Sequence, residues 1–151
     1  MSIVTIERKV LEKNDAFAAM NRDALVRQGV FTINMVSSPG AGKTTLLERT
    51  IAHLDGALAL AVVEGDVQTD LDAQRVAKYG VPVVQIVTNG GCHLEARLVQ
   101  DALSRLDLSA TDVLVIENVG NLVCPANFDL GEDLKVVVLS VTEGDDKPLK
   151  Y

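Results

Sequence analysis

The stretch Phe31 to Thr45, FTINMVSSPGAGKTT, decides the fold of this chain. Its apolar first half predicts a buried strand, and the small residues from Ser37 to Gly42 predict a tight loop. The residues that follow, KTTLLERTIAHL, have the apolar periodicity of a helix. A strand, a loop of small residues and a helix in this order form the context that a nucleotide phosphate loop requires.

The chemistry of this loop suits a nucleoside triphosphate. Its backbone N–H groups can surround phosphate oxygens, and the helix N-terminus adds its positive dipole end. The Lys43 ammonium can reach the β- and γ-phosphates, and the Thr44 hydroxyl is placed to bind magnesium. The pattern G-x-x-x-x-G-K-[ST] is broken only at its first glycine, which is Ser37 here. The competing interpretation is a glycine-rich turn with an incidental lysine. The residues predicted to bind nucleotide are Gly40, Ala41, Gly42, Lys43, Thr44 and Thr45.

Composition excludes several classes of protein. The chain has 151 residues, of which 48% are hydrophobic but only 3% aromatic, so its core is aliphatic and suits strands buried on both faces. Because 14 basic residues face 21 acidic ones, a nucleic-acid surface is not expected. No apolar run approaches membrane-spanning length, and the charged N-terminus does not resemble a secretory signal. We therefore expect a cytoplasmic protein with no membrane partner, whose cysteines are thiols or metal ligands.

Strands and helices are predicted to alternate after a first amphipathic helix at about residues 6–28. This alternation predicts an α/β fold, with a mostly parallel sheet covered by helices on both faces. We divide the chain into an N-terminal helix (1–29) that packs on a nucleotide-binding domain (30–151). The predicted strands are 30–36, 57–65, 82–88, 112–118 and 134–141, and the later helices are 43–54, 71–80 and 93–106.

Two carboxylates are predicted at the ends of strands. Asp66 follows the second strand and Glu117 ends the fourth, where either can hold magnesium directly or through water. Gly120, three residues after Glu117, can give its N–H to a γ-phosphate, although phosphate-loop enzymes usually have Asp rather than Glu before this glycine. The alternative is that both acids cap turns or helices. We assign catalysis to Lys43, Thr44, Asp66 and Glu117, and magnesium binding to the last three of these.

Cys92, His93 and Cys124 carry ligands that transition ions select. The first two lie where a loop is predicted to enter a helix, and a helix dipole there would lower a thiol pKa. The cysteines lie at the ends of the third and fourth strands, so the fold can bring them together. Adjacent residues do not easily face one ion, which favours a site completed by two subunits. The alternative is that each cysteine is a small buried hydrophobe, since the spacing is not C-x-x-C.

Together these residues resemble the HypB family of hydrogenase nickel-incorporation GTPases. The likeness runs from about Val10 to Tyr151 and includes SSPGAGKTTLLE, EGDVQTDLDAQR, GGCHLEA, IENVGNLVCPANFDLGE and SVTEGDDKPLKY. The resemblance implies a dimerising, SIMIBI-like G domain whose GTP cycle is coupled to nickel insertion into a hydrogenase precursor, together with other nickel-maturation proteins. It also implies that Cys92, His93 and Cys124 hold nickel or zinc at a homodimer interface.

Three features depart from the family pattern. No CCGCP-like or histidine-rich metal segment is present, so the chain resembles forms that have only the G-domain site. Asn89 stands in TNGGCH where a glycine is expected. The chain also stops at Tyr151, whereas family members continue with an N-K-x-D segment that reads guanine, so we expect a truncated domain. The alternatives are a urease-type nickel accessory GTPase, a small ATP-binding kinase or transferase, and a non-catalytic binding module.

Overall fold

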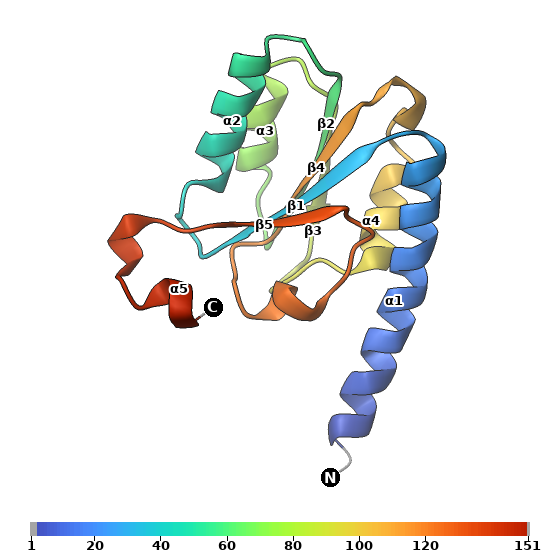
Figure 1. The fold of residues 1–151 in the computed structure, drawn as a ribbon, viewed down its shortest axis with the longest axis vertical. Helices are drawn as coiled ribbons and strands as arrows, with labels where there is room; N and C mark the ends of the chain where they lie inside the picture. Colours follow the sequence, from blue (N-terminus) through green and yellow to red (C-terminus); the bar gives the residue numbers. More distant parts are fainter. Residues whose placement is uncertain (1–2, 151) are drawn as a thin grey trace.

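The computed structural model describes residues 3–150, which form a parallel sheet between two groups of helices (Figure 1). Five strands pair in parallel in the order β3-β2-β4-β1-β5. The strands are β1 (Phe31–Ser37), β2 (Leu60–Asp66), β3 (Val83–Val87), β4 (Val113–Glu117) and β5 (Leu134–Val138). The α-helices are α1 (Ile3–Arg27), α2 (Lys43–Leu54), α3 (Leu71–Ala77), α4 (Ala96–Leu103) and α5 (Lys147–Lys150). The 3-10 helices are η1 (Leu108–Ala110), η2 (Cys124–Asn127) and η3 (Val141–Glu143).

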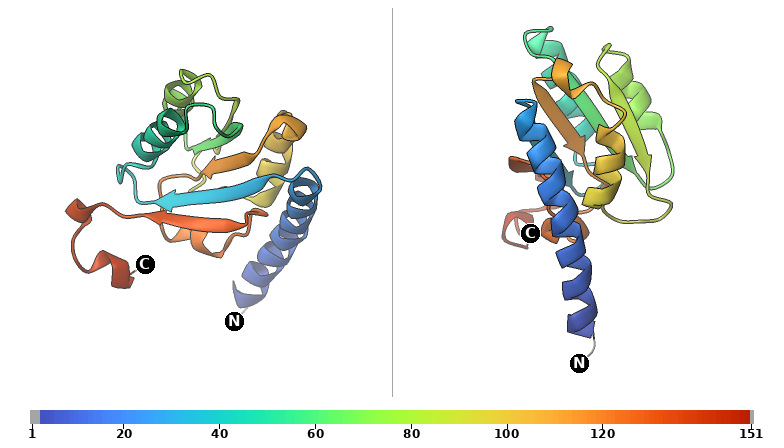
Figure 2. Two further views of the ribbon diagram at one scale, coloured as in Figure 1. Left: turned by 45° about the horizontal axis from the view of Figure 1, so that its top comes forward. Right: turned by 90° about the vertical axis from the view of Figure 1, so that its right-hand side faces the viewer.

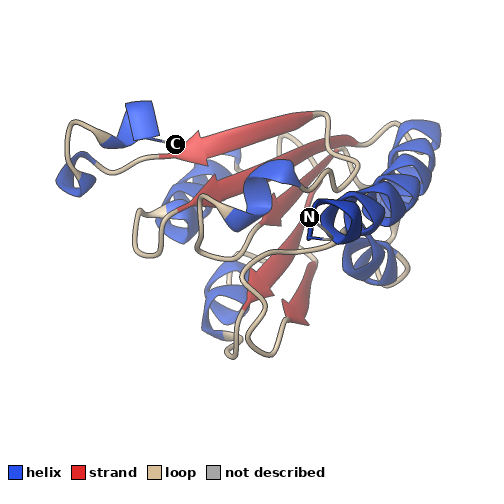
Figure 3. Ribbon diagram, turned by 90° about the horizontal axis from the view of Figure 1, so that it is seen from below, coloured by secondary structure: helices blue, strands red, loops and turns tan. Residues whose placement is uncertain are grey.

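The two faces of the sheet carry different helices (Figures 2 and 3). Successive residues of a strand point to opposite faces, so each strand contributes to both cores. In β2, Ala61 and Val63 pack with residues of α1 and α4, whereas Leu60 and Val62 pack with residues of α2 and α3. The predicted α/β fold of a phosphate-loop NTPase, with helices on both faces of a parallel sheet, is therefore confirmed.

All carboxyl ends of the strands meet at one edge of the sheet, where such folds bind ligands. The pairing of β2 with β4 sets Glu64 opposite Glu117, and the pairing of β1 with β4 sets Met35 opposite Glu117. Residues paired in this way point to the same face of the sheet. Because Met35 packs with α2 residues, both carboxylates lie on the face that α2 covers.

The helix predicted at 43–54 has these bounds in the structure, but the next strand begins later than predicted. It starts at Leu60 rather than Ala57. Asp55 and Gly56 adopt positive φ (44° and 78°), which turns the chain between α2 and the strand. The N–H of Ala57 then donates to the Leu54 carbonyl at 2.8 Å, so this residue closes the turn.

The start of α4 also differs from the prediction. The helix begins at Ala96 rather than His93, because Glu95 has extended backbone dihedrals (φ −106°, ψ 152°) and acts as its N-cap. Leu94 is fully buried in the core that α1 and α4 share. The segment before α4 is therefore an irregular loop that inserts a leucine into the core, and not a first helical turn.

Helix α1 lies beside α4, and its N-terminal part extends past the sheet (Figure 1). Ala18 and Leu25 are buried, and Asn21 Nδ2 donates to the carbonyls of Ala96 (2.8 Å) and Leu130 (3.0 Å). These contacts join α1 to the rest of the fold, while a domain boundary at residue 29 stays a prediction. Within residues 3–150, no helix combines the length and apolar character needed to cross a membrane.

Candidate functional site

The phosphate loop connects β1 to α2. Gly40 (φ 73°) and Gly42 (φ 102°) adopt left-handed conformations that other residues rarely adopt, so the loop requires both glycines. Gly42 precedes α2 without a side-chain cap, which leaves the first N–H groups of the helix available to an anion. Ser37 lies within β1 and its hydroxyl donates to the Ser38 carbonyl at 2.8 Å. Strand geometry does not require glycine at this position.

Lys43 and Thr44 open α2, and both are buried. The Thr44 hydroxyl donates to Glu117 Oε1 at 2.5 Å, which brings two of the predicted magnesium ligands side by side. Within the described chain, the other carboxylate oxygen of Glu117 is buried and has no partner. A buried carboxylate beside a threonine hydroxyl offers the hard oxygen ligands that magnesium takes.

Glu64 is a further buried acid at this site, and the sequence motifs did not predict it. It lies beside Glu117, is 2% exposed, and has one oxygen without a partner among the described residues. Burial and the neighbouring carboxylate together raise the pKa of Glu64 to about 10, although the positive charge of Lys43 opposes this shift. Glu64 therefore keeps its proton at neutral pH. The sequence marks Glu64 only by its position, since it is an acidic residue directly after the apolar run ALAVV of a predicted buried strand.

Asp66 lies at the same edge, but its carboxylate also closes its own loop. Oδ1 accepts from the N–H groups of Gln68 (3.0 Å) and Thr69 (3.3 Å), and Oδ2 accepts from the Thr69 hydroxyl (3.1 Å). Burial disfavours the charged form, yet these hydrogen bonds prevail and lower the pKa of Asp66. Asp66 is therefore ionised beside the phosphate loop. It also caps the turn at residues 66–69, as the alternative interpretation expected.

Gly120 packs directly against the phosphate loop. A Cβ added to this glycine would lie 3.1 Å from Pro39 Cα, so only a glycine fits here without displacing the loop. Both residues line a cavity of about 260 Å³ together with Lys43 and Asp66. The predicted γ-phosphate sensor and the predicted phosphate-binding lysine therefore face one space.

A second cavity of about 260 Å³ also adjoins the loop and is lined by residues 40–45, Asp72 and Arg75. The Arg75 guanidinium donates to Thr45 Oγ1 at 3.2 Å and also pairs with Glu48. Sequence reasoning missed this arginine, because nothing in a short helix marks one residue as facing the loop. A larger apolar cavity, of about 420 Å³, lies at the opposite end of the sheet and contains no predicted site residue.

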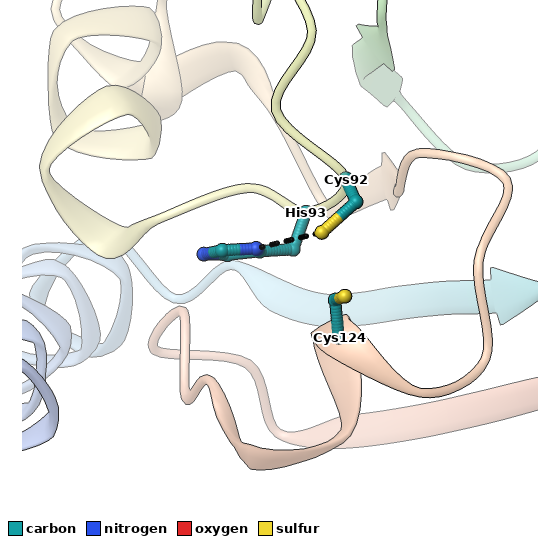
Figure 4. A group of neighbouring side chains, drawn as sticks. All are labelled: Cys92, His93 and Cys124. Carbon is teal, nitrogen blue, oxygen red and sulfur yellow. Dashed lines mark hydrogen bonds between the residues drawn. The ribbon is translucent and has the colours of Figure 1, made fainter. Parts of the chain in front are cut away.

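Cys92, His93 and Cys124 lie close together at the same edge of the sheet (Figure 4). One ligand atom from each lies within 4.8 Å of the others, and Cys92 Sγ is 3.6 Å from His93 Nδ1. We call these three residues the thiol–imidazole cluster. The expectation that adjacent Cys92 and His93 do not face one point is wrong, because the bend at these two residues sets their ligand atoms side by side and within reach of Cys124 Sγ.

The pKa of Cys92 is raised rather than lowered. The hydrogen bond with the neighbouring Cys124 thiol causes this rise in pKa, and partial burial adds to it. The prediction of a lowered pKa assumed a helix N-terminus at this position, whereas α4 begins only at Ala96. Thiols of this kind lose their protons when they bind a metal cation, so metal binding here would release protons.

Several contacts fix the cluster in place. The His93 ring stacks on Phe128 with centroids 4.0 Å apart. Asn121 Oδ1 accepts from the N–H of Cys124 at 3.3 Å, at the start of η2. Asn89, the departure noted in TNGGCH, has φ 52°, a left-handed conformation that asparagine tolerates better than most residues. The substitution therefore preserves the turn that leads to Cys92.

Comparison with known proteins agrees with this geometry. The family model described as the CobW/HypB/UreG nucleotide-binding domain matches residues 31–147. A crystal structure of HypB from Archaeoglobus fulgidus superposes with a TM-score of 0.84 at 42% identity, covering 92% of this chain and 68% of that one. The chain belongs to the HypB family.

Other HypB proteins are similar over nearly all of the chain. The hydrogenase maturation factor HypB of Rhizobium leguminosarum bv. viciae is 58% identical over 149 residues, which are 99% of this chain and 50% of that protein. A crystal structure of HypB from Helicobacter pylori in complex with nickel has a TM-score of 0.87 at 47% identity, covering 92% of this chain and 66% of that one. The chain thus spans about half the length of the curated relatives it matches.

Proposed function

We propose that this chain binds and hydrolyses GTP and couples the nucleotide cycle to nickel delivery during hydrogenase maturation. One observation carries the proposal: a phosphate loop and a thiol–imidazole cluster share one edge of the sheet in a member of the HypB family. An ATP-dependent kinase or transferase would use the loop but would leave Cys92, His93 and Cys124 without a role.

In this proposal the phosphates lie on the backbone of the loop, and Lys43 neutralises charge that develops on the transferring γ-phosphate. Gly120 donates its N–H to the same phosphate. No described side chain beside the loop is a strong neutral-pH base, which is consistent with the slow intrinsic turnover of a switch. The residues proposed for nucleotide binding are Gly40, Ala41, Gly42, Lys43, Thr44, Thr45 and Gly120.

The proposed magnesium ligands are Thr44 and Glu117, with Asp66 acting directly or through water. Buried carboxylate oxygens without partners fit a cation at this position. Magnesium would supply charge neutralisation between the β- and γ-phosphates. Burial and, after it, the neighbouring Glu117 raise the pKa of Glu64, and a bound cation would oppose this rise by favouring the ionised form.

Nickel is the proposed cargo, and zinc is its expected competitor. Two thiolates and an imidazole bind both ions well, so the ligands alone do not select nickel. One subunit offers three converging ligand atoms, which leaves a position open in a four-coordinate shell. We propose that a second copy of the chain completes the shell, so that a homodimer holds the ion and hands it to a hydrogenase precursor or another nickel-maturation protein in the cytoplasm.

The decisive experiment measures hydrolysis of GTP and ATP, and nickel and zinc affinity with mass by light scattering, in wild type, Cys92→Ala and Cys124→Ala. We expect hydrolysis of GTP with little preference over ATP, because these 151 residues contain no N-K-x-D segment to read guanine. We also expect nickel binding that both variants weaken at least about a hundredfold. Unchanged nickel binding in both variants would remove the cluster from the proposal. Tight nickel binding by a strict monomer would remove the shared site.

A second recipient enzyme is favoured by one comparison. The HypB of Helicobacter hepaticus, 49% identical over 152 residues, is named a hydrogenase/urease maturation factor. We therefore propose urease as the alternative recipient. Restoration of urease or of hydrogenase activity in a bacterial strain that lacks its own HypB distinguishes the two.

A further inference from the structure

Asn118 is a buried amide that contacts both parts of the site without belonging to either. It follows Glu117 at the carboxyl end of β4 and is 2% exposed. Its backbone N–H donates to the Met35 carbonyl at 2.9 Å, and its Nδ2 donates to Asn34 Oδ1 at 3.1 Å. Both bonds reach β1, so the residue is anchored to the centre of the sheet.

The side-chain oxygen of Asn118 accepts from two different segments. The N–H of Val119 donates to Oδ1 at 2.9 Å, and the N–H of Leu94 donates to the same atom at 3.2 Å. Val119 leads directly to Gly120 at the phosphate loop, whereas Leu94 directly follows His93. One oxygen atom therefore joins the segment that faces the phosphates to the segment that carries two cluster residues.

The phosphate-facing segment has little freedom of its own. Gly120 lies against Pro39, and both line the cavity that also contains Lys43 and Val119. A γ-phosphate in that cavity would meet the backbone of residues 119–120. Any movement of this backbone would change the Val119 bond to Asn118, whose oxygen also accepts from Leu94.

Cys124 is held by a separate set of bonds. Lys135 of β5 donates from Nζ to the carbonyls of Pro125 (3.2 Å) and Ala126 (3.0 Å), which lie in η2 beside this cysteine. The Cys124 end of the cluster is therefore fixed to the edge strand. The segment of Cys92 and His93 is instead joined to Asn118 through the N–H of Leu94.

We propose that Asn118 is a positioning residue that transmits nucleotide binding to the thiol–imidazole cluster through its hydrogen bond to Leu94. The inference rests on the proposed function, because it requires that the chain bind both nucleotide and nickel. Turning the amide shifts Leu94, and with it His93 and Cys92, relative to Cys124. The distance between the ligands, and hence the nickel affinity, then depends on the nucleotide. By linkage, nickel changes nucleotide affinity by the same factor.

The test is a set of nickel dissociation constants, measured with and without magnesium and a non-hydrolysable GTP analogue, in wild type, Asn118→Ala and Asn21→Ala. Asn21 is the matched control, because it is an equally buried asparagine that bridges Ala96 and Leu130. We expect the analogue to change nickel affinity at least about fivefold in wild type and Asn21→Ala, but less than about twofold in Asn118→Ala. Nickel binding without nucleotide should stay within about threefold of wild type in both variants.

The same factors should appear in the nucleotide affinities measured with and without nickel. Equal coupling in wild type and Asn118→Ala would overturn the inference, as would absence of coupling in a wild-type protein that binds both ligands. If the wild-type protein fails to bind either nucleotide or nickel, the proposed function itself is overturned. If thermal unfolding shows that Asn118→Ala does not fold, Asn34→Ala replaces it, since it removes the acceptor that orients the Asn118 amide. If the GTP analogue still changes nickel affinity in Asn34→Ala as it does in wild type, Asn118 does not transmit nucleotide binding to the cluster.

Discussion

The phosphate loop and the thiol–imidazole cluster lie at the same edge of the sheet but are built differently. The loop consists of consecutive residues, and the positive φ of Gly40 and Gly42 sets its shape. The cluster joins two segments that are distant in the sequence, and its shape depends on side-chain contacts such as the stack of His93 on Phe128. A short motif therefore predicts the shape of the loop, whereas the residue types of the cluster predict its members but not the contacts that set its shape.

The largest expected effect separates the two sites. Lys43→Ala should lower nucleotide affinity and hydrolysis by about a hundredfold or more, because in the proposed function the lysine supplies the charge that meets the β- and γ-phosphates. Nickel affinity without nucleotide should change less than about twofold, since Lys43 does not contact the cluster. Fluorescent-nucleotide titration and a phosphate-release assay measure the first effect, and chelator competition measures the second.

Lys78→Ala is the matched control for this variant, because Lys78 is an exposed lysine next to α3. It should behave as wild type in all three assays. Equal nucleotide affinity in Lys43→Ala and wild type would show that the phosphates bind elsewhere.

The second effect concerns the carboxyl pair beneath the loop. Glu64 has a raised pKa of about 10 in the folded protein and an ordinary value of 4.5 in the unfolded chain. The folded state therefore holds a proton that the unfolded state releases, so stability is full below about pH 4.5 and falls as the pH rises toward 10. Glu64→Gln removes this dependence. Relative to the variant, wild type should lose about 4 kcal/mol of unfolding free energy between pH 5 and pH 8, at roughly 1.4 kcal/mol per pH unit.

Urea unfolding of nucleotide-free protein in EDTA measures this difference, with Glu48→Gln as a control on an acid that is not fully buried. Parallel pH profiles of wild type and Glu64→Gln would mean that Glu64 is ionised in the folded state. Added magnesium and GTP analogue should reduce the difference, because a nearby cation favours the ionised form of Glu64 and so lowers its pKa.

The sequence predicted the alternation of strands and helices, and the bounds of α2 agree with the prediction because its apolar periodicity and the preceding glycines are local signals. The starts of β2 and α4 were wrong, since Asp55 at positive φ and the burial of Leu94 are consequences of packing. The apolar periodicity that begins at His93 does not show that Leu94 is inserted into the core before the helix starts at Ala96.

The candidate site shows the same division. The loop residues and the three cluster residues were all identifiable from residue type and from the resemblance. Glu64, Arg75 and Asn118 were missed, because their proximity to the loop depends on strand register and helix orientation. A buried acid or amide in an apolar strand is a usable signal, but its partner belongs to another strand.

The third prediction examines the side chains that fix the cluster. Phe128→Leu keeps an apolar side chain but removes the ring on which His93 stacks, so we expect nickel affinity to fall by roughly tenfold or less. Nucleotide affinity should be unchanged. Phe31→Leu, at the amino end of β1 and therefore at the opposite end of the sheet, is the control. A nickel affinity that does not differ between the two variants would mean that the stack leaves the ligand orientation unchanged.

The smallest effect concerns the tether between α1 and the loop after η2. Arg22 donates to both carboxylate oxygens of Asp129, at 2.7 and 2.9 Å, and both side chains are partly exposed. Burial opposes ionisation of Asp129, but the bonds from Arg22 and from the N–H of Gly131 prevail and lower its pKa. The contribution to stability is therefore present above the unfolded value of about 3.8 and is lost as the pH falls through the lowered pKa.

Arg22→Ala should consequently cost about 0.5–1 kcal/mol at pH 7, a modest value because solvent screens the pair, and progressively less below about pH 4. Because Asp129 follows Phe128, we also expect nickel affinity to fall by no more than about threefold, with no change in nucleotide affinity. Urea unfolding at both pH values and chelator competition measure these effects, with Arg27→Ala as a surface control at the end of α1. A nickel loss as large as that of Phe128→Leu would mean that α1, rather than the histidine stack, sets the geometry of the cluster.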